Sequence, residues 1–307
     1  MQGFRTWQLF AICVALWGTT WHAITYQLSD MPAELGVALR FALAGATVLL
    51  VCRWRRAPLR FALADHAMLA LQGVFLYGVS YVCTYHAERF VASGLVAVGF
   101  SASPLLAGIG AALLFGTTLA PRFVVGGVLG LLGVALIFWP ELTRPARGDS
   151  AAIGAAFTMA AVLLSAVGSL AASRNRHRGV PLLPAMGFGM LYGALAALVV
   201  ALALGRSFVW PTAPSWWISL GYLAFFGSVL TFACFLTLQD RIDVGPAGTV
   251  GVMTPLVALL VSLAFEGFRP DLLTVAGALL AVAGNALMLI PAGRRAGAPR
   301  QDARAAG

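Results

Sequence analysis

The chain has 307 residues, of which 60% are hydrophobic and only 10% are charged, and its mean hydropathy is +0.89. Average soluble domains carry about 25% charged residues, so this composition excludes an ordinary soluble enzyme and indicates an integral membrane protein. The net charge is +9, but all twenty basic residues are Arg, dispersed over the segments between apolar runs. Dispersed Arg fits contact with anionic lipid and argues against a nucleic-acid partner.

Ten apolar segments follow one another along the chain, each long enough to cross a hydrocarbon layer of about 30 Å as a helix. The first five are 9–28, 35–51, 67–85, 94–115 and 123–139, and the second five are 151–172, 182–204, 216–238, 244–265 and 272–290. The connections between them are short and leave no room for a soluble catalytic domain. We therefore predict an all-α integral membrane protein with ten transmembrane helices.

The second half of the chain repeats the first. Twelve of the forty-seven residues in 94–140 recur without a gap 151 positions later, among them Pro104 with Pro255 and Gly133 with Gly284. Because each copy holds five spans, an odd number, the second copy must enter the bilayer from the opposite side, and inverted repeats are typical of transporters. The expected division is a first five-helix repeat at 1–143, a second, inverted one at 144–291 and a tail at 292–307.

The Arg residues give the expected orientation of the helices, because cytoplasmic loops of membrane proteins carry an excess of positive charge. With the amino terminus inside, fourteen Arg fall in cytoplasmic segments and five outside, and Arg40 within the second span completes the twenty. We therefore expect both termini to be cytoplasmic, in a multi-pass protein of a bacterial-type inner membrane.

Short motifs stand in a fixed order along the chain. They are Trp17-Gly18-Thr19-Thr20 in the first span, Arg40-Phe41 in the second, Ser103-Pro104-Leu105 in the fourth, and Thr254-Pro255-Leu256 with Phe265-Glu266-Gly267 at the ninth. In these motifs, and over nearly its whole length, the chain resembles drug/metabolite transporters of the EamA type. One departure is that Phe115-Gly116-Thr117-Thr118 follows the fourth span, where that family has a Gly-Glu pair.

Aromatic side chains gather on two predicted helices. Tyr77, Tyr81 and Tyr85 are spaced four residues apart, so one face of the third helix should present three rings. Trp17 and Trp21 form a similar pair on the first helix. Such faces can hold an aromatic side chain while an indole or phenol bonds its polar end. The alternative is an interfacial belt or packing between helices, which we favour for Tyr85. In its aromatic residues the chain resembles bacterial exporters of aromatic and other neutral amino acids.

Few ionisable residues lie inside the predicted spans. Arg40 lies about 9 Å into the second span. It could meet a substrate carboxylate. Alternatively, it has a structural role, which we favour, and reaches the headgroups or pairs with Glu34 or Glu88. His22 and His86 could titrate near neutral pH, but no Asp or Glu lies in the middle of a span to support proton coupling. Exporters of lipophilic cations generally need a buried acidic group, so this absence favours neutral or zwitterionic cargo.

Pro and Gly mark special positions in the spans. Pro104 and Pro255 lie about ten residues into their spans, where each frees a backbone carbonyl near mid-membrane. They are either hinges that line the substrate path or kinks that only improve packing. Small-residue faces, with Gly133 on span five and Gly284 on span ten, favour close helix contact in the scaffold or in a homodimer.

The sequence therefore predicts a carrier that exports small neutral metabolites, aromatic amino acids first, by alternating access around a cavity lined by spans one, three, four, six, eight and nine. Other efflux carriers, for sugars, nucleotide-sugars or drugs, are the alternative, and missing metal and nucleophile motifs disfavour a membrane-embedded enzyme. We expect a small-molecule substrate and no cofactor or metal. The candidate binding residues are Trp17, Trp21, His22, Arg40, Tyr77, Tyr81, Ser101, Ser165 and Ser169, with Pro104 and Pro255 as helix breaks.

Overall fold

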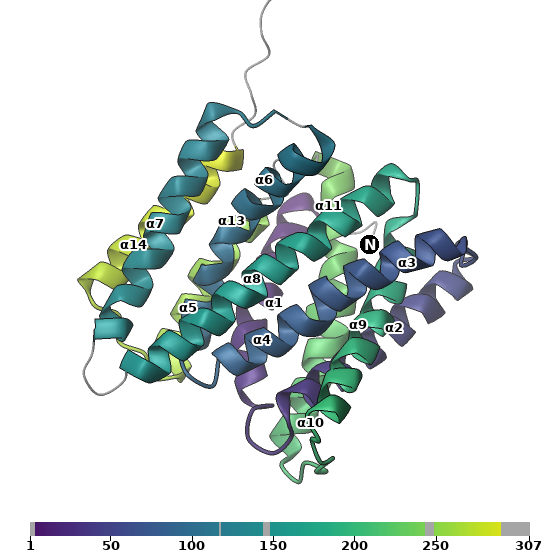
Figure 1. Cartoon of the computed structure of the whole chain (residues 1–307), viewed down its shortest axis with the longest axis horizontal. Coiled ribbons are helices and arrows are strands. Elements are labelled where there is room, and N and C mark those ends of the chain that lie inside the picture. Colours follow the sequence, from purple (N-terminus) through teal and green to yellow (C-terminus); the bar gives the residue numbers. More distant parts are fainter. Residues whose placement is uncertain (1–3, 117, 144–147, 243–248, 290–307) are drawn as a thin grey trace, which may run out of the picture.

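The computed structural model describes residues 4–116, 118–143, 148–242 and 249–289, and these residues are helical, with no strand among them (Figure 1). Helical rods correspond in order to the predicted apolar segments. The rods are α1 (Thr6–Thr25), α2 (Ala33–Trp54), α3–η1–α4 (Leu63–Gly73, Val74–Val79, Ser80–Ala87), α5–η2–α6 (Ser93–Gly99, Phe100–Ala102, Ser103–Phe115), α7 (Pro121–Thr143), α8 (Gly148–His177), α9 (Leu182–Ala203), α10–η3–α11 (Pro214–Gly221, Tyr222–Leu230, Thr231–Ile242), α13 (Thr249–Phe265) and α14 (Leu272–Leu289).

The described residues contain eight helical stretches that are long and apolar enough to cross a membrane. The helix α13 is apolar but shorter, with 17 residues, and the 20-residue α1 is not among the eight. An all-helical, multi-pass membrane architecture is thus confirmed. The number of ten transmembrane helices and the location of the termini stay predictions. The tail at 292–307 and the junction at 144–147 lie outside the described residues.

The repeat is visible in how helices end. Gly116 and Gly267, which are 151 residues apart, follow α6 and α13 with φ angles of +67° and +63°. A left-handed backbone at the end of a helix favours glycine, which has no Cβ to clash. The recurrence of glycine at these two positions therefore has a conformational cause.

The helices α7 and α14 lie side by side at one flank of the bundle (Figure 1). A Cβ atom added at Gly126 would lie 2.5 Å from the carbonyl oxygen of Gly284, and one at Gly133 would lie 2.5 Å from the carbonyl oxygen of Gly277. The residue number rises along one helix as it falls along the other, so the two helices are antiparallel. In the repeat, position 126 is equivalent to 277 and position 133 is equivalent to 284. The contact between 126 and 284 is therefore the symmetric counterpart of the contact between 133 and 277. The predicted small-residue faces thus join two helices of one chain.

The other helix contacts also occur in equivalent pairs. The helix α2 packs along α9, its equivalent in the second half, at the flank opposite α7 and α14 (Figure 1). Between the flanks, α1 packs against α13 and α11, and α8 packs correspondingly against α6 and α4. The halves of the chain therefore interlock through matching contacts, and their central helices surround the interior.

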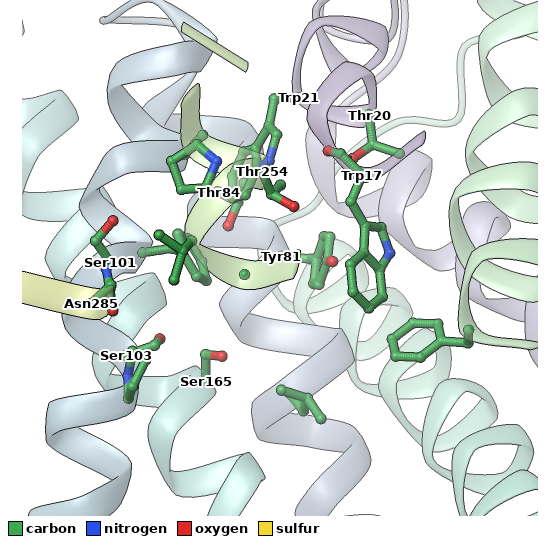
Figure 2. Close-up of a pocket in the computed structure, with 18 of the residues that line it drawn as sticks. Trp17, Thr20, Trp21, Tyr81, Thr84, Ser101, Ser103, Ser165, Thr254 and Asn285 are labelled. Atoms are coloured by element: carbon green, nitrogen blue, oxygen red, sulfur yellow. The ribbon is translucent and has the colours of Figure 1, made fainter. Parts of the chain in front are cut away.

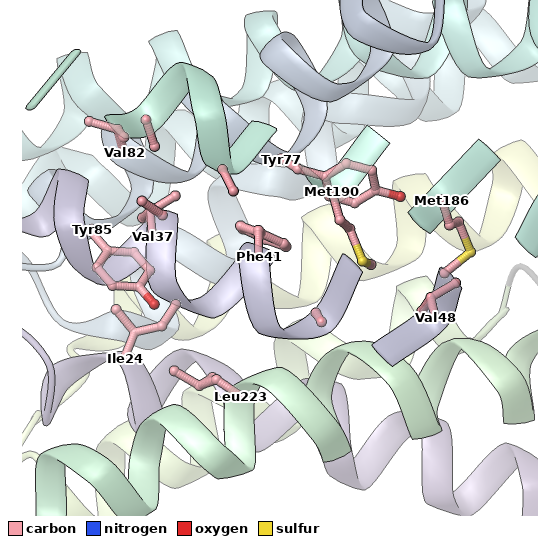
Figure 3. Packing of buried hydrophobic residues seen from close by; sticks show 14 of the residues in the cluster. Ile24, Val37, Phe41, Val48, Tyr77, Val82, Tyr85, Met186, Met190 and Leu223 are labelled. Carbon is pink, nitrogen blue, oxygen red and sulfur yellow. The ribbon is translucent and has the colours of Figure 1, made fainter. Parts of the chain in front are cut away.

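The largest buried apolar cluster fills the α2–α9 flank (Figure 3). Phe41 of α2 packs against Tyr77 of η1 with ring centroids 5.4 Å apart, and Tyr85 of α4 lies near Ile24 of α1. Close packing holds α2 rigidly, since protein interiors are packed as densely as organic crystals. This cluster fixes the helix from which Arg40 projects.

Candidate functional site

A cavity of about 460 Å³ lies among the central helices. This volume is in the range of small-molecule sites in proteins. The predicted residues that line it are Trp17, Trp21, Arg40, Tyr77, Tyr81, Ser101, Pro104, Ser165 and Pro255. The tertiary structure thus brings together residues from six rods of both halves of the chain.

Two predicted binding residues are not among the residues that line the cavity. His22 bonds Glu266 at one end of the bundle, and Ser169 lies one helical turn beyond Ser165 on α8. The expected set of lining spans was also too small, because α2, α7 and α14 contribute Arg40, Phe123 and Asn285. Asn285 is a polar residue inside an apolar run, and this feature of the sequence could have indicated that α14 lines the cavity.

One side of the cavity is aromatic. The rings of Trp17 and Tyr81 lie near one another there (Figure 2). The indole Nε1–H of Trp17 donates to the carbonyl oxygen of Gly227 at 3.2 Å, and the ring meets Phe232 edge-on with centroids 5.1 Å apart. Trp21 packs against Phe100 at 5.2 Å. The satisfied indole donor of Trp17 and the packed rings give a preformed apolar surface.

The three tyrosines do not share one environment. Tyr77 and Tyr81 line the cavity, whereas the Tyr85 hydroxyl donates to Oε1 of Gln27 at 2.7 Å inside the core. The expectation that all three rings share one face is therefore wrong for Tyr85. The bond to Gln27 in the core agrees with the packing role that we favoured for Tyr85. The π-helical segment η1 spans Val74–Val79 and breaks the regular helical spacing. Such segments are frequent at functional sites, and η3 occupies the matching place in the second half.

The opposite side of the cavity is polar. Ser101, Ser103 and Asn285 lie together there, away from Trp17 and Tyr81 (Figure 2). The hydroxyls of Ser101 and Ser103 are buried and have no partner among the described residues. A buried hydroxyl without a hydrogen bond is costly, so these groups are available to a ligand or to water.

The two prolines have different settings. Pro104 lies in the first turn of α6, directly after the 3₁₀ segment Phe100–Ala102, where the fourth rod changes helix type but stays continuous. Pro255 lies inside α13, which continues unbroken from Thr249 to Phe265. Both line the cavity. The helix breaks and the hinge roles expected of the two prolines stay predictions.

Arg40 is buried, with 3% of its surface exposed, and is the only charged residue among the described residues that line the cavity. The expected pairing with Glu34 does not form. That carboxylate accepts instead from His86, at 3.0 Å, and Arg206, at 3.4 Å.

Glu266 joins the two halves of the chain at one end of the cavity. Its carboxylate accepts hydrogen bonds from the backbone N–H of Ser93, at 3.0 Å, and from the hydroxyl of the same residue. His22 Nδ1 lies 2.9 Å from Oε1 of Glu266. Beside it, the Ser262 hydroxyl accepts from the N–H of Gly94 at 2.8 Å. Side chains and backbone from three rods, α1, α5 and α13, thus meet at the carboxylate of Glu266. From the sequence, Glu266 was recognised only as part of a motif at the ninth span.

Comparison with known proteins agrees with this architecture. The profile of the EamA-like transporter family matches residues 5–139 and again 152–290. Protein PagO of Salmonella typhimurium (strain LT2) is 23% identical over 255 residues, 82% of each chain. The uncharacterized inner membrane transporter YedA of Escherichia coli (strain K12) is 25% identical over 263 residues, 84% of this chain and 82% of that one.

A crystal structure with 22% sequence identity shares the fold, with a TM-score of 0.64 over 91% of this chain and 94% of the other. The family profile covers most of the sequence, in two copies that correspond to its two halves. The chain therefore belongs to the EamA-like transporter family.

Proposed function

We propose that this transporter exports small neutral or zwitterionic metabolites across the inner membrane, with aromatic amino acids as the leading substrates. The observation that carries the proposal is the cavity, in which the rings of Trp17 and Tyr81 face the free hydroxyls of Ser101 and Ser103. An aromatic amino acid needs an apolar surface for its ring and hydrogen-bond partners for its polar end. The name of the relative YedA supports the inner membrane as the location.

Transport by alternating access is supported by the internal symmetry. Equivalent helices α7 and α14 meet in antiparallel fashion, and the contacts of α1 have counterparts in those of α8. This is the arrangement expected of inverted repeats that rock around a central site. The two ranges that match the family, 5–139 and 152–290, support repeats at 1–143 and 144–291.

The contacts at the two ends of the cavity favour an inward-facing state. Its lining reaches Gly251 and Leu289, near the start of α13 and the end of α14, which the Arg distribution places on the cytoplasmic side. At the other end, the bonds of Glu266 to Ser93 and His22 tie the halves together. Export would require these bonds to break when the cavity opens outward.

Counterflow in liposomes tests the proposed function directly. The purified protein is reconstituted, and uptake of radiolabelled phenylalanine, tryptophan, threonine and methionine is compared with that of arginine and glucose. We expect saturable uptake of the neutral amino acids, greatest for the aromatic ones. Uptake no greater than in empty liposomes would refute amino acids as cargo and direct the search to sugars and drugs.

Trp17→Ala is expected to lower phenylalanine counterflow about tenfold, whereas Trp17→Phe should retain most of it. A ring–ring contact contributes about 0.5–1.5 kcal/mol beyond its buried area, and a tenfold change corresponds to ~1.4 kcal/mol. Trp54→Ala is the control, because Trp54 is 82% exposed at the end of α2. Equal losses in Trp17→Ala and Trp54→Ala would show that the effect is not specific to the cavity.

A further inference from the structure

Arg40 is buried without a bonded counter-ion. It lies on α2, only 3% of its surface is exposed, and its Nε and Nη1 atoms have no hydrogen-bond partner among the described residues. A buried charge that lacks a partner is strongly unfavourable, so such a residue normally faces an ion or a ligand. Because Arg40 also lines the cavity, the ligand is a candidate partner.

Aromatic stacking explains how Arg40 is held but leaves its Nε and Nη1 donors without a partner among the described residues. The guanidinium carbon lies 4.9 Å from the ring centroid of Tyr81 and 5.1 Å from that of Phe41. Such cation–π contacts use the flat face of the guanidinium, whereas its N–H groups point outward in the plane. The rings therefore fix the orientation of the guanidinium, whose Nε and Nη1 donors can each hydrogen-bond an anionic oxygen.

Neither Glu34 nor Glu88, the carboxylates that could pair with Arg40, fills this role in the described part of the chain. Glu34 is bonded to His86 and Arg206. Glu88 is buried at the end of α4, and among the described residues neither of its oxygens has a hydrogen-bond partner and no ion pair joins it to Arg40. Burial raises the pKa of the Glu88 carboxyl well above its usual range, and the nearby Glu266 acts in the same direction, against the opposing effect of Arg40. With both of its oxygens unpartnered among the described residues, Glu88 forms no ion pair that would compensate the charge of Arg40.

We propose that Arg40 binds the carboxylate of the cargo, so that the cavity accepts aromatic monocarboxylates with or without an amino group. The proposal rests on the proposed transport function and extends its substrate class to aromatic anions that lack the ammonium group. The aromatic body of such a molecule would lie against Trp17 and Tyr81, close to the guanidinium that stacks on Tyr81. An ammonium group, by contrast, finds no Asp or Glu among the described lining residues, only neutral oxygens such as those of Ser101 and Asn285. The carboxylate is therefore the required group and the amine is dispensable.

A matched pair of ligands tests this inference. The compounds 3-phenylpropionate and 3-phenylpropanamide differ only in the carboxylate. Each is measured as a competitor of labelled phenylalanine counterflow and, independently, by calorimetric binding to the protein in lipid nanodiscs. In the wild type we expect the acid to bind about ten- to hundredfold more tightly than the amide, because a hydrogen bond between charged groups is lost in the amide.

Substitution of Arg40 should abolish the discrimination between acid and amide. In Arg40→Gln the two compounds should bind about equally, and Arg40→Lys should restore part of the preference for the acid. Arg89→Gln, on an exposed turn outside the cavity, is the matched control and should keep the full preference.

The outcomes separate this inference from the proposed function. Equal binding of acid and amide to the wild type overturns the role of Arg40, even if phenylalanine is transported and even if Arg40→Gln does not fold. An acid preference that persists in folded Arg40→Gln overturns it as well. If phenylalanine is not carried but the acid binds through Arg40, the proposed amino-acid export fails while the carboxylate site stands.

Discussion

Gly133→Leu is expected to prevent α7 and α14 from packing and to leave little folded protein. Any Cβ at this position would lie 2.5 Å from both the backbone nitrogen of Ala281 and the carbonyl oxygen of Gly277. These are main-chain atoms of a neighbouring helix, so they cannot move aside as the end of a side chain can. Overpacking costs about 1–3 kcal/mol where side chains can adjust, and here a whole helix must shift. Thermal unfolding and size-exclusion chromatography after detergent extraction measure the effect.

A second glycine at the contact between α7 and α14 can be tested in the same way, and a glycine in open space serves as the control. Gly277→Leu, at the position equivalent to Gly126, should be as damaging, because its Cβ would lie 2.6 Å from the carbonyl oxygen of Gly133. Gly221→Leu, at the end of α10, should be tolerated because a Cβ there meets no atom within 4 Å. A Gly133→Leu protein as stable as the Gly221→Leu protein would show that α7 and α14 do not approach this closely.

Glu266→Ala is expected to release the end of the cavity that Ser93 and His22 close, and to lower counterflow about tenfold or more. The substitution removes hydrogen bonds to a carboxylate, which contribute about 1.5–3 kcal/mol each. If these bonds exist in the inward-facing state only, a loss of about 3 kcal/mol would change the ratio of the two states by about a hundredfold. The protein should then rest in the outward-open state and cycle slowly.

Labelling of the cavity from outside the cell measures this shift in state. With the four native cysteines replaced, Thr20→Cys places a thiol in the cavity near the Glu266 end. A membrane-impermeant maleimide should label it faster in Glu266→Ala than in the parent, with Glu266→Gln in between. Asp271→Asn is the control, because Asp271 accepts from the N–H of Thr274 at the start of α14 and Asn caps helices equally well. Unchanged labelling and flux in Glu266→Ala would exclude a role in closure.

The sequence alone determined the class and order of the elements. In lipid every backbone polar group must be bonded within the protein, so an apolar run of about twenty residues has to be a helix. The helical rods follow the predicted runs, and the 151-residue repeat pairs Gly116 with Gly267, each of which follows the end of a helix. Because all of these features depend on residues close in sequence, or on a repeat that can be read directly, no three-dimensional contact was needed to find them.

Only the tertiary structure decided which faces of the helices meet. Tyr81 and Tyr85 lie one turn apart on α4, yet Tyr81 lines the cavity while Tyr85 bonds Gln27. Glu266 and Ser93 are 173 residues apart, and their bond depends on how α5 and α13 are rotated and placed. Hydropathy records how apolar a helix is but not its rotation against distant neighbours. That rotation, set by close packing across the whole chain, left Arg40 in the cavity with free donors and took His22 out of it.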